Sequence, residues 1–445
     1  MAKRPGPLAV MLAATGLLAA PLAQAGLLLA IFDEAERKAP QWQVAEQARQ
    51  AVLAAEPIAR AGLRPELLLD GNYGRSRVDV RESRSPFVEE ERNYGDVGGA
   101  AVRLRQPLID LPARARVAQY DARRAGAESD HQQAYQELIL DVGQRYLLWL
   151  EAESALAFAD AQLKTLEQRL EQMTGREELG LATLSDRLLI EAERDLADSR
   201  RIEAAAGLRA ARERIRELIG RVPEQPTPLA TPMPLTDPVP ADPDAWVRRA
   251  LDSNPTRARA VARRDEAQQA VREQRGRRYP QLALNLEHAL QDSADFQLGS
   301  ESENSRAELQ LRLPLYQGGA VSAGIAVAEA ERAQRESELW ELDRALDRET
   351  RNAYDGVVTG VVRVRAARRS LQSAQAAREA INGRFDTGLA TLAELLSATD
   401  KVREALRDLA IARHRYLLST LNLESIAGSL DRDDLARVDA LLAPR

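Results

Sequence analysis

The sequence contains no cysteine and only three histidines. Without cysteine it can form no disulfide, no thiolate nucleophile and no thiolate metal site. The histidines, His131, His288 and His414, are scattered, so they lack the short spacing of a zinc-binding pair. It also lacks Gly-x-Gly-x-x-Gly, Gly-x-Ser-x-Gly and Gly-Lys-Ser/Thr motifs. We therefore expect a protein that is not an enzyme, with no catalytic residue, no metal and no other cofactor.

A basic excess is missing as well. The chain carries 62 Lys and Arg against 68 Asp and Glu, for a net charge of -6, and nucleic-acid binding needs a basic surface. Aromatic residues make up only 4% of the 445 residues, while Ala, Leu, Arg and Glu are abundant. This composition is typical of long helices and coiled coils, so we expect no nucleic-acid partner and a mainly helical chain.

Residues 1–25 have the pattern of a secretory signal peptide. Lys3 and Arg4 precede an apolar run from Leu8 to Ala20, and Ala23-Gln24-Ala25 forms a small-residue cleavage site before Gly26. An uncleaved anchor helix is the alternative, because apolar residues resume just after Gly26. No other apolar run approaches membrane-spanning length, so a location in a membrane would require a β-barrel.

The rest of the chain contains an internal repeat. The pentapeptide Gly-Leu-Ala-Thr-Leu occurs at 180–184 and at 388–392, and Pro65 and Pro280 each precede a run with strand character. Such repeats indicate tandem duplication. We therefore expect a first structural repeat at 26–220, a proline-rich linker at 221–243, a second repeat at 244–428 and a C-terminal tail at 429–445.

Each repeat predicts the same order of elements. In both, a helix of about 33 residues, two strands, a helix of about 65 residues, a glycine turn and a helix of about 38 residues follow one another. The predicted helices are 28–61, 111–177 and 184–219 in the first repeat, and 243–276, 321–385 and 392–427 in the second. Apolar residues at 3-4 spacing, such as Leu138, Val142, Tyr146 and Trp149, predict coiled-coil packing. The two shorter helices together match the length of the long one, which suggests that they stack end to end beside it.

The predicted strands alternate apolar and polar residues. Leu309 and Leu311 alternate with Gln310 and Arg312, and the run from Leu282 to Glu287 alternates in the same way. A soluble sheet packed on a core would show this pattern, and so would strands of about ten residues in an outer-membrane barrel. Tyr73, Tyr94, Tyr279 and Tyr316 lie near strand ends, where an aromatic girdle would fall, and segments 76–93 and 291–305 are polar enough to be loops. Four strands cannot close a barrel, so a barrel would be shared by several copies.

These features together resemble the TolC family of outer-membrane efflux and secretion channels. The resemblance is carried by the duplicated element order, by Leu104-Arg105-Gln106-Pro107-Leu108, by Leu313-Pro314-Leu315-Tyr316-Gln317-Gly318-Gly319 and by the two pentapeptide turns. Within the family, the greatest similarity is to the branch that serves type I secretion and multidrug pumps. It is found in the segment 32–55 and in Leu63-Arg64-Pro65, which leads into the first predicted strand.

The resemblance implies a mainly α fold with a membrane β-barrel. Three copies would form a long coiled-coil helical tunnel and, with four strands per protomer, a shared twelve-stranded barrel. The homotrimer would be a passive exit duct in the outer membrane of a Gram-negative bacterium, extending into the periplasm. Its partners would be outer-membrane lipid, a periplasmic adaptor and an inner-membrane transporter. The alternative is an exported periplasmic coiled-coil scaffold whose strands form a small soluble domain.

The resemblance places adaptor docking and the periplasmic gate at the helical tip. The docking residues would be Gly180, Leu181, Ala182, Thr183, Leu184, Gly388, Leu389, Ala390, Thr391 and Leu392, and the gate residues would be Asp186, Glu394, Phe385 and Ser185. In a trimer, Asp186 and Glu394 would each form a ring of three carboxylates, although an acid in the first turn of a helix is also favoured by the helix dipole alone. Ala390, Phe385 and Ser397 replace the Arg, Tyr and second acid of the family's best-known gate, so we expect closure by packing and other polar contacts.

Overall fold

The computed structural model describes residues 26–79, 92–223, 225–230, 232–293 and 300–442. The predicted signal peptide, 1–25, lies outside the described residues. The first half contains α1 (Leu27–Lys38), α2 (Pro40–Ala54), α3 (Glu56–Ala61), β1 (Glu66–Asp79), β2 (Arg92–Ile109), α4 (Leu111–Glu178) and α5 (Leu184–Ile219). The second half contains α6 (Pro243–Ser253), α7 (Pro255–Gly276), β3 (Gln281–Ser293), β4 (Ser300–Arg312), α8 (Ala320–Asp386) and α9 (Leu392–Ile426), and α10 (Arg432–Asp439) follows in the predicted tail.

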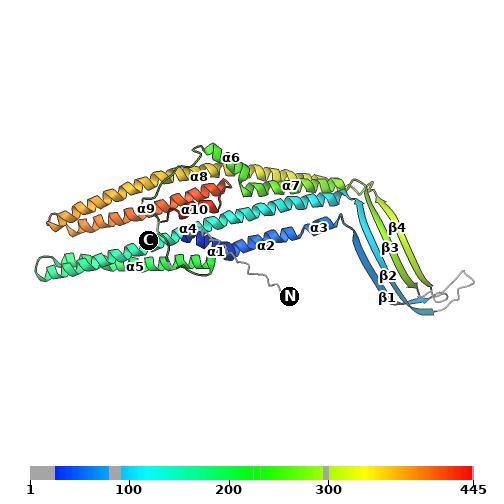
Figure 1. The fold of residues 1–445 in the computed structure, drawn as a ribbon, viewed down its shortest axis with the longest axis horizontal. Helices are drawn as coiled ribbons and strands as arrows, with labels where there is room; N and C mark the ends of the chain where they lie inside the picture. Colours follow the sequence, from blue (N-terminus) through cyan, green and yellow to red (C-terminus); the bar gives the residue numbers. More distant parts are fainter. Residues whose placement is uncertain (1–25, 80–91, 224, 231, 294–299, 443–445) are drawn as a thin grey trace, which may run out of the picture.

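The molecule is elongated, with helices along most of its length and the sheet at one end (Figure 1). Two long helices set this length, because α4 has 68 residues and α8 has 67, about 100 Å each at 1.5 Å per residue. Both α5 and the pair α2–α3 contact α4, α5 toward the far tip and α2–α3 toward the sheet (Figure 1). The predicted alignment of the two shorter helices beside the long one is therefore confirmed. No helix among the described residues is both long enough and apolar enough to cross a membrane.

The prediction of one continuous helix before each pair of strands is wrong. The segment 28–61 is broken into α1, α2 and α3, and 243–276 is broken into α6 and α7. Pro40 and Pro255 occupy the first helical turn of α2 and α7, and the preceding Ala39 and Asn254 are extended, with ψ of 122° and 124°. Proline disfavours the helical conformation of the residue before it, so each of these prolines starts a new helix.

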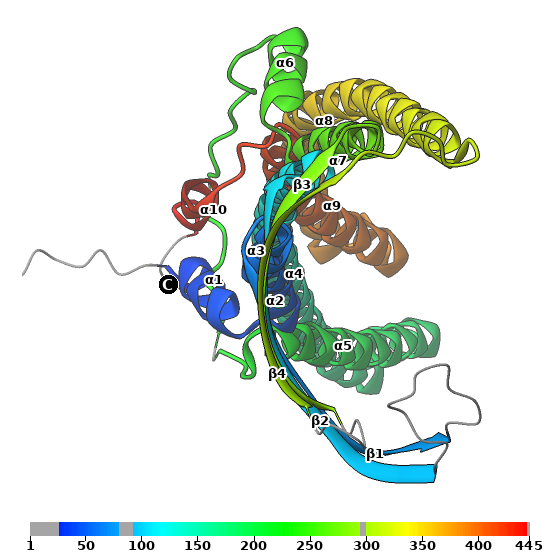
Figure 2. The same cartoon turned by 90° about the vertical axis from the view of Figure 1, so that its right-hand side faces the viewer.

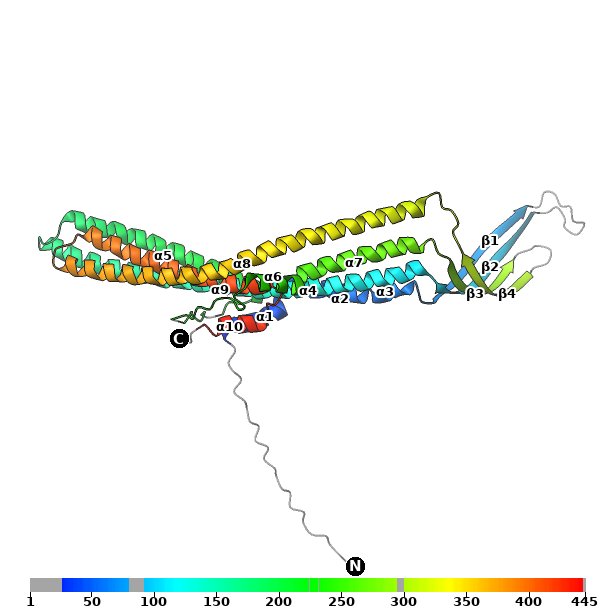
Figure 3. The same cartoon turned by 90° about the horizontal axis from the view of Figure 1, so that it is seen from above.

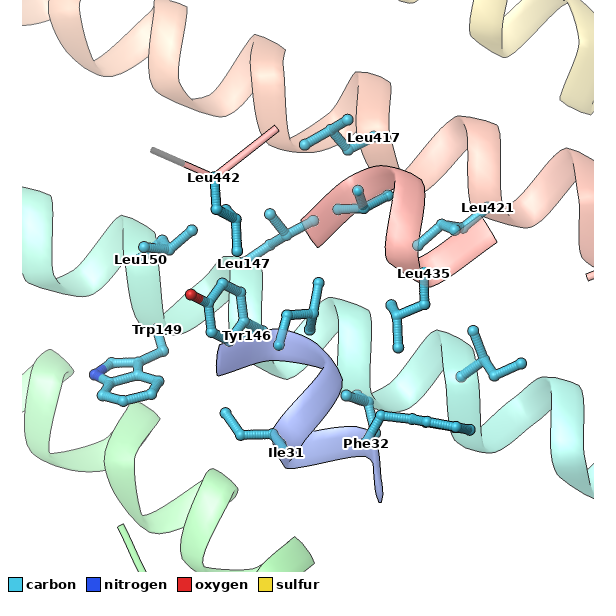
Figure 4. Close-up of a cluster of buried hydrophobic side chains, with 14 of the residues drawn as sticks. Ile31, Phe32, Tyr146, Leu147, Trp149, Leu150, Leu417, Leu421, Leu435 and Leu442 are labelled. Atoms are coloured by element: carbon cyan, nitrogen blue, oxygen red, sulfur yellow. The ribbon is translucent and has the colours of Figure 1, made fainter. Parts of the chain in front are cut away.

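The largest hydrophobic core lies midway along the molecule, where α1, α4, α5, α8, α9 and α10 meet (Figure 4). The predicted α4 seam of Leu138, Val142, Tyr146 and Trp149 is buried in this core, which confirms its orientation. The Tyr146 hydroxyl accepts a hydrogen bond from the Thr227 amide at 2.9 Å and donates to the Thr227 carbonyl at 3.1 Å. The linker is thereby attached to the core.

The four strands form one antiparallel sheet in the order β1-β2-β3-β4. The sheet is curved, with α9 on the side of its concave face and α1 and α10 on the other side (Figure 2). The strands contain 13 to 18 residues, so the expected length of about ten is too short. The prediction that 76–93 and 291–305 are loops is wrong at the ends of both segments, where the ladders continue to Asp79, from Arg92, to Ser293 and from Ser300. Ladder hydrogen bonds join backbone groups and need no apolar side chain.

Candidate functional site

The sheet has one apolar and one polar face. Residues directly opposite each other in an antiparallel ladder point to the same side, and the register joins Leu67 to Leu104 and Leu104 to Leu286. It also joins Leu282 to Leu311 and Leu284 to Leu309. The apolar face consists of Leu67, Leu69, Tyr73, Val102, Leu104, Leu282, Leu284, Leu286, Leu290, Leu309 and Leu311. The alternation predicted from the sequence therefore aligns across all four strands.

Charged residues form a ladder on the opposite face. Arg103 of β2 lies between Asp70 of β1 and Glu287 of β3, with nitrogen-oxygen distances of 2.5 and 3.6 Å. On the apolar face, polar side chains begin toward the hairpin ends, where His288 Nδ1 lies 2.9 Å from Ser305 Oγ. The apolar side chains thus form a band with a polar boundary.

The sheet projects beyond the helices, and none of the helices in the described part of the chain covers either of its faces (Figures 1 and 3). Large apolar side chains, including Leu69 and Leu309, are exposed as a result. Within the described part of the chain, one edge of β1 and one edge of β4 pair with no strand. Tyr73, Tyr279 and Tyr316 are exposed. Tyr279 and Tyr316 lie close to the start of β3 and the end of β4, but Tyr73 lies midway along β1, so the predicted position near a strand end is wrong for Tyr73. The side chain of Tyr94 lies outside the described residues. The apolar face and the two edges are surfaces that need partners.

At the opposite end, the two pentapeptides form matching turns. Gly180 and Gly388 have positive φ values of 70° and 77°, a conformation that glycine adopts without strain. The amide of Leu181 donates to the Arg176 carbonyl at 2.8 Å, and Leu389 donates to the Arg384 carbonyl at the same distance. These bonds close the last turn of α4 and of α8. The prediction that both glycines reverse the chain at the hairpin tips is confirmed.

The two acids of the predicted gate belong to helix caps. Asp186 accepts from the Thr183 amide at 3.3 Å while its own amide donates to Thr183 Oγ1 at 3.2 Å, and Glu394 makes the same pair of bonds with Thr391 at 2.7 and 3.2 Å. These are capping boxes. The hydrogen bonds from Thr391 hold the pKa of Glu394 below its usual range. Each acid therefore has a local structural role, whether or not it also faces a pore.

The other two predicted gate residues differ in burial. Phe385 is half-buried and packs with Leu392 in a small cluster with Met173 and Ile190, which joins the α4/α5 hairpin to the α8/α9 hairpin. Ser185 is exposed at the start of α5. Phe385 thus connects two hairpins of one chain, and its role in a gate stays a prediction.

The predicted docking residues are largely on the surface. Leu181, Leu184 and Leu389 are exposed, as is Leu179 immediately before the first turn. Ala182 and Ala390 are half-buried, and Thr183 and Thr391 serve as helix caps. The turns thus present leucine side chains at the end of the rod, next to the capping groups that hold the turns in shape.

A family model described as "Outer membrane efflux protein" matches residues 31–221 and 246–429. The chain belongs to the outer membrane efflux protein family. It is 24% identical to outer membrane protein TolC of Escherichia coli over 428 residues, covering 94% of this chain and 85% of TolC. It is 29% identical to proteases secretion protein PrtF of Dickeya chrysanthemi over 421 residues, covering 93% of this chain and 90% of PrtF. The resemblance predicted from the sequence is thereby confirmed.

The fold agrees with that of a solved outer membrane protein. The crystal structure of the outer membrane protein VceC from Vibrio cholerae matches with a TM-score of 0.77 at 18% identity, covering 90% of this chain and 96% of VceC. At this identity the likeness shows the fold alone. The predicted class, mainly helical with four strands per chain, is confirmed.

The structure contains a charged surface groove that the sequence patterns above do not predict. A groove of about 790 Å³ runs between α5 and α9 near the tip, and it is lined by charges of both signs, including Glu193, Arg200, Asp400, Arg403 and Arg407. Charged residues recur at a spacing of three or four along this part of α9, which is the signal for one charged helical face. The second wall of the groove is α5, which belongs to the other hairpin. Its position beside α9 results from tertiary packing and has no signal in the sequence of α9.

Proposed function

We propose that the chain is the outer-membrane exit duct of a tripartite efflux or type I secretion system. The observation that carries this proposal is the uncovered sheet, with an apolar band on one face, charged residues on the other and two unpaired edges. This is the arrangement of a lipid-facing and a lumen-facing surface. Family membership supports the same conclusion.

Three copies would complete the barrel. Unpaired backbone groups are prohibitively costly in hydrocarbon, so the free edges of β1 and β4 must each pair with a neighbouring copy. A cyclic trimer with four strands per chain gives twelve strands and leaves no edge. The helices would continue the barrel as a tunnel across the periplasm, because α4 and α8 extend from the sheet to the tip (Figure 1).

The partners would be a periplasmic adaptor and an inner-membrane transporter. The exposed leucines of the two turns offer an apolar contact surface for the helices of an adaptor. The relative PrtF is a proteases secretion protein, which supports protein export as one use of the duct. The duct itself would perform no catalytic step.

Extraction and mass measurement test the proposal. Membranes containing the protein are washed with high salt and then solubilised with detergent, and the purified species is measured by light scattering with correction for bound detergent. The expected result is release by detergent only and a mass of three chains. Release by salt as a stable monomer would refute the channel and would favour the periplasmic scaffold.

A further inference from the structure

The C-terminal helix places a buried carboxylate at the beginning of the chain. Asp439, the last residue of α10, is 8% exposed. Its Oδ1 accepts a hydrogen bond from the Leu28 amide at 3.2 Å, and the amides of Gly26 and Leu29 also point at the carboxylate. Asp439 therefore caps α1 from 411 residues away in the sequence.

No cation balances this carboxylate among the residues that the structure describes. The two arginines of α10 are otherwise engaged, since Arg432 pairs with Asp33 at 3.0 Å and Arg437 pairs with Asp434. Burial raises the pKa of Asp439 even though three amides donate to it. A buried carboxylate without a cation is expensive, so a positive charge beside Asp439 would stabilise the folded chain.

The same carboxylate restricts which residue can occupy position 26. A Cβ atom built on Gly26 would lie 2.0 Å from Asp439 Oδ2. Its backbone angles, φ of −61° and ψ of 168°, suit any residue, so glycine is required here by the closeness of Asp439 and not by backbone strain. Gly26 is also the first residue after the Ala23-Gln24-Ala25 cleavage site expected from the sequence.

We propose that the amino group released when the leader is removed between Ala25 and Gly26 is the cation of this site. A leader peptidase would hydrolyse the Ala25–Gly26 peptide bond, with water supplying the hydroxyl of the new Ala25 carboxyl group. The leaving nitrogen becomes the α-amino group of Gly26, takes up a proton and gains a positive charge beside Asp439. In the precursor the same nitrogen is a neutral amide with one N–H.

The ion pair would secure α10 against α1 only in the mature chain. The two helices already share the Arg432–Asp33 pair, and Leu435 and Val438 of α10 lie in one buried cluster with Leu28 of α1. None of these contacts involves the nitrogen of Gly26. The new charge adds a contact that depends on processing, so the C-terminal segment would be held most firmly after the leader is gone.

Reactivity of the α-amino group tests the proposal directly. The mature protein is purified in detergent after export and removal of the leader. It is then treated at pH 8 with an amine-selective acylating reagent, and labelling of the N-terminal peptide is followed by mass spectrometry. At pH 8, close to the usual α-amino pKa, an ion pair that raises this pKa by one unit reduces the fraction of free amine about fivefold. For a rise of one unit or more, we therefore expect N-terminal labelling at least about fivefold slower in the wild type than in Asp439→Asn.

Two matched variants complete this test. Asp433→Asn removes an exposed charge from the same helix and should label at the wild-type rate. Insertion of Ser-Ser between Ala25 and Gly26 keeps Asp439 but moves the amine away, so it should label as fast as Asp439→Asn and remains informative if that variant does not fold. Equal labelling of the wild type and the insertion variant, or a mature chain that does not begin at Gly26, would overturn the proposal.

The pH dependence of stability provides a second measurement. An α-amino pKa raised in the folded state gives stability that is complete below about pH 8, the usual value, and is lost as the pH rises through the folded pKa. The nearby Tyr146 of α4 does not interfere, because burial raises its pKa to about 12. The charged groups around the site are Asp33 and Arg432, which pair with each other, and Asp434 and Arg437, which form a second pair. The wild type should lose thermal stability between pH 8 and 10 by more than the insertion variant, and identical profiles would contradict the ion pair.

Discussion

Leu309 tests which face of the sheet meets lipid. It is 67% exposed in the single chain, pairs with Leu284 and shares its face with Ala307 and Leu311, near the middle of the apolar part of β4. Replacing it with lysine would place a charge in hydrocarbon, which costs about 2–4 kcal/mol at the midplane of a bilayer. That cost corresponds to a factor of roughly 30 to 1000 in an equilibrium constant for each copy, and a trimer carries it three times.

Gln310→Lys is the matched control. Gln310 is the next residue on the same strand and points to the polar face, where its Oε1 lies 3.3 Å from Asn285 Nδ2. A lysine there should change stability by no more than about 0.5 kcal/mol. The assay is urea unfolding from lipid vesicles together with the yield of trimer in the outer-membrane fraction. Equal effects of the two substitutions, or a larger effect of Gln310→Lys, would refute the assignment of the faces.

Three other predictions concern the tip and the core. Replacing both Gly180 and Gly388 with valine should abolish export, because both positions have a positive φ and valine is strained in that conformation. Trimers should persist, because the turns lie far from the sheet. Unimpaired export, measured beside trimer bands on gels, would count against this prediction. Changing Asp186 to Asn together with Glu394 to Gln should reduce cation preference and divalent block in planar-bilayer recordings if these acids line the pore; unchanged selectivity would leave them as helix caps only. Phe32→Ala should destabilise the fold by about 3–5 kcal/mol, since Phe32 is fully buried, and thermal unfolding that matches the wild type would contradict this.

The architecture could be predicted because its signals are local and repeated. The 3-4 spacing on α4, the alternation on β3 and β4 and the duplicated turn each report one element without knowledge of its neighbours. Pro40 and Pro255 were equally visible, and a proline in the first turn is a start signal for a helix. Reading each as part of a longer helix overlooked the restriction that proline imposes on the residue before it.

The capping role of the tip acids could also be predicted from the sequence. Thr183 and Asp186, and likewise Thr391 and Glu394, stand three residues apart at the start of a helix, which is the spacing of a capping box. The contact of Asp439 with the first turn of α1 could not be predicted, because it joins residues 411 positions apart and no periodic pattern reports such a pairing.

Identical sequence at the two turns does not give them identical surroundings. Leu184 and Leu392 close the same pentapeptide, but Leu184 is 54% exposed and Leu392 only 5%. The difference arises from packing between hairpins, because Leu392 fills the cluster with Met173 and Ile190 of the first hairpin. The α4/α5 turn therefore keeps its leucine free, while the α8/α9 turn uses the equivalent leucine to hold the two hairpins together. A partner that docks on apolar side chains would find more of them at the first turn, so the duplicated tips are not equivalent docking surfaces.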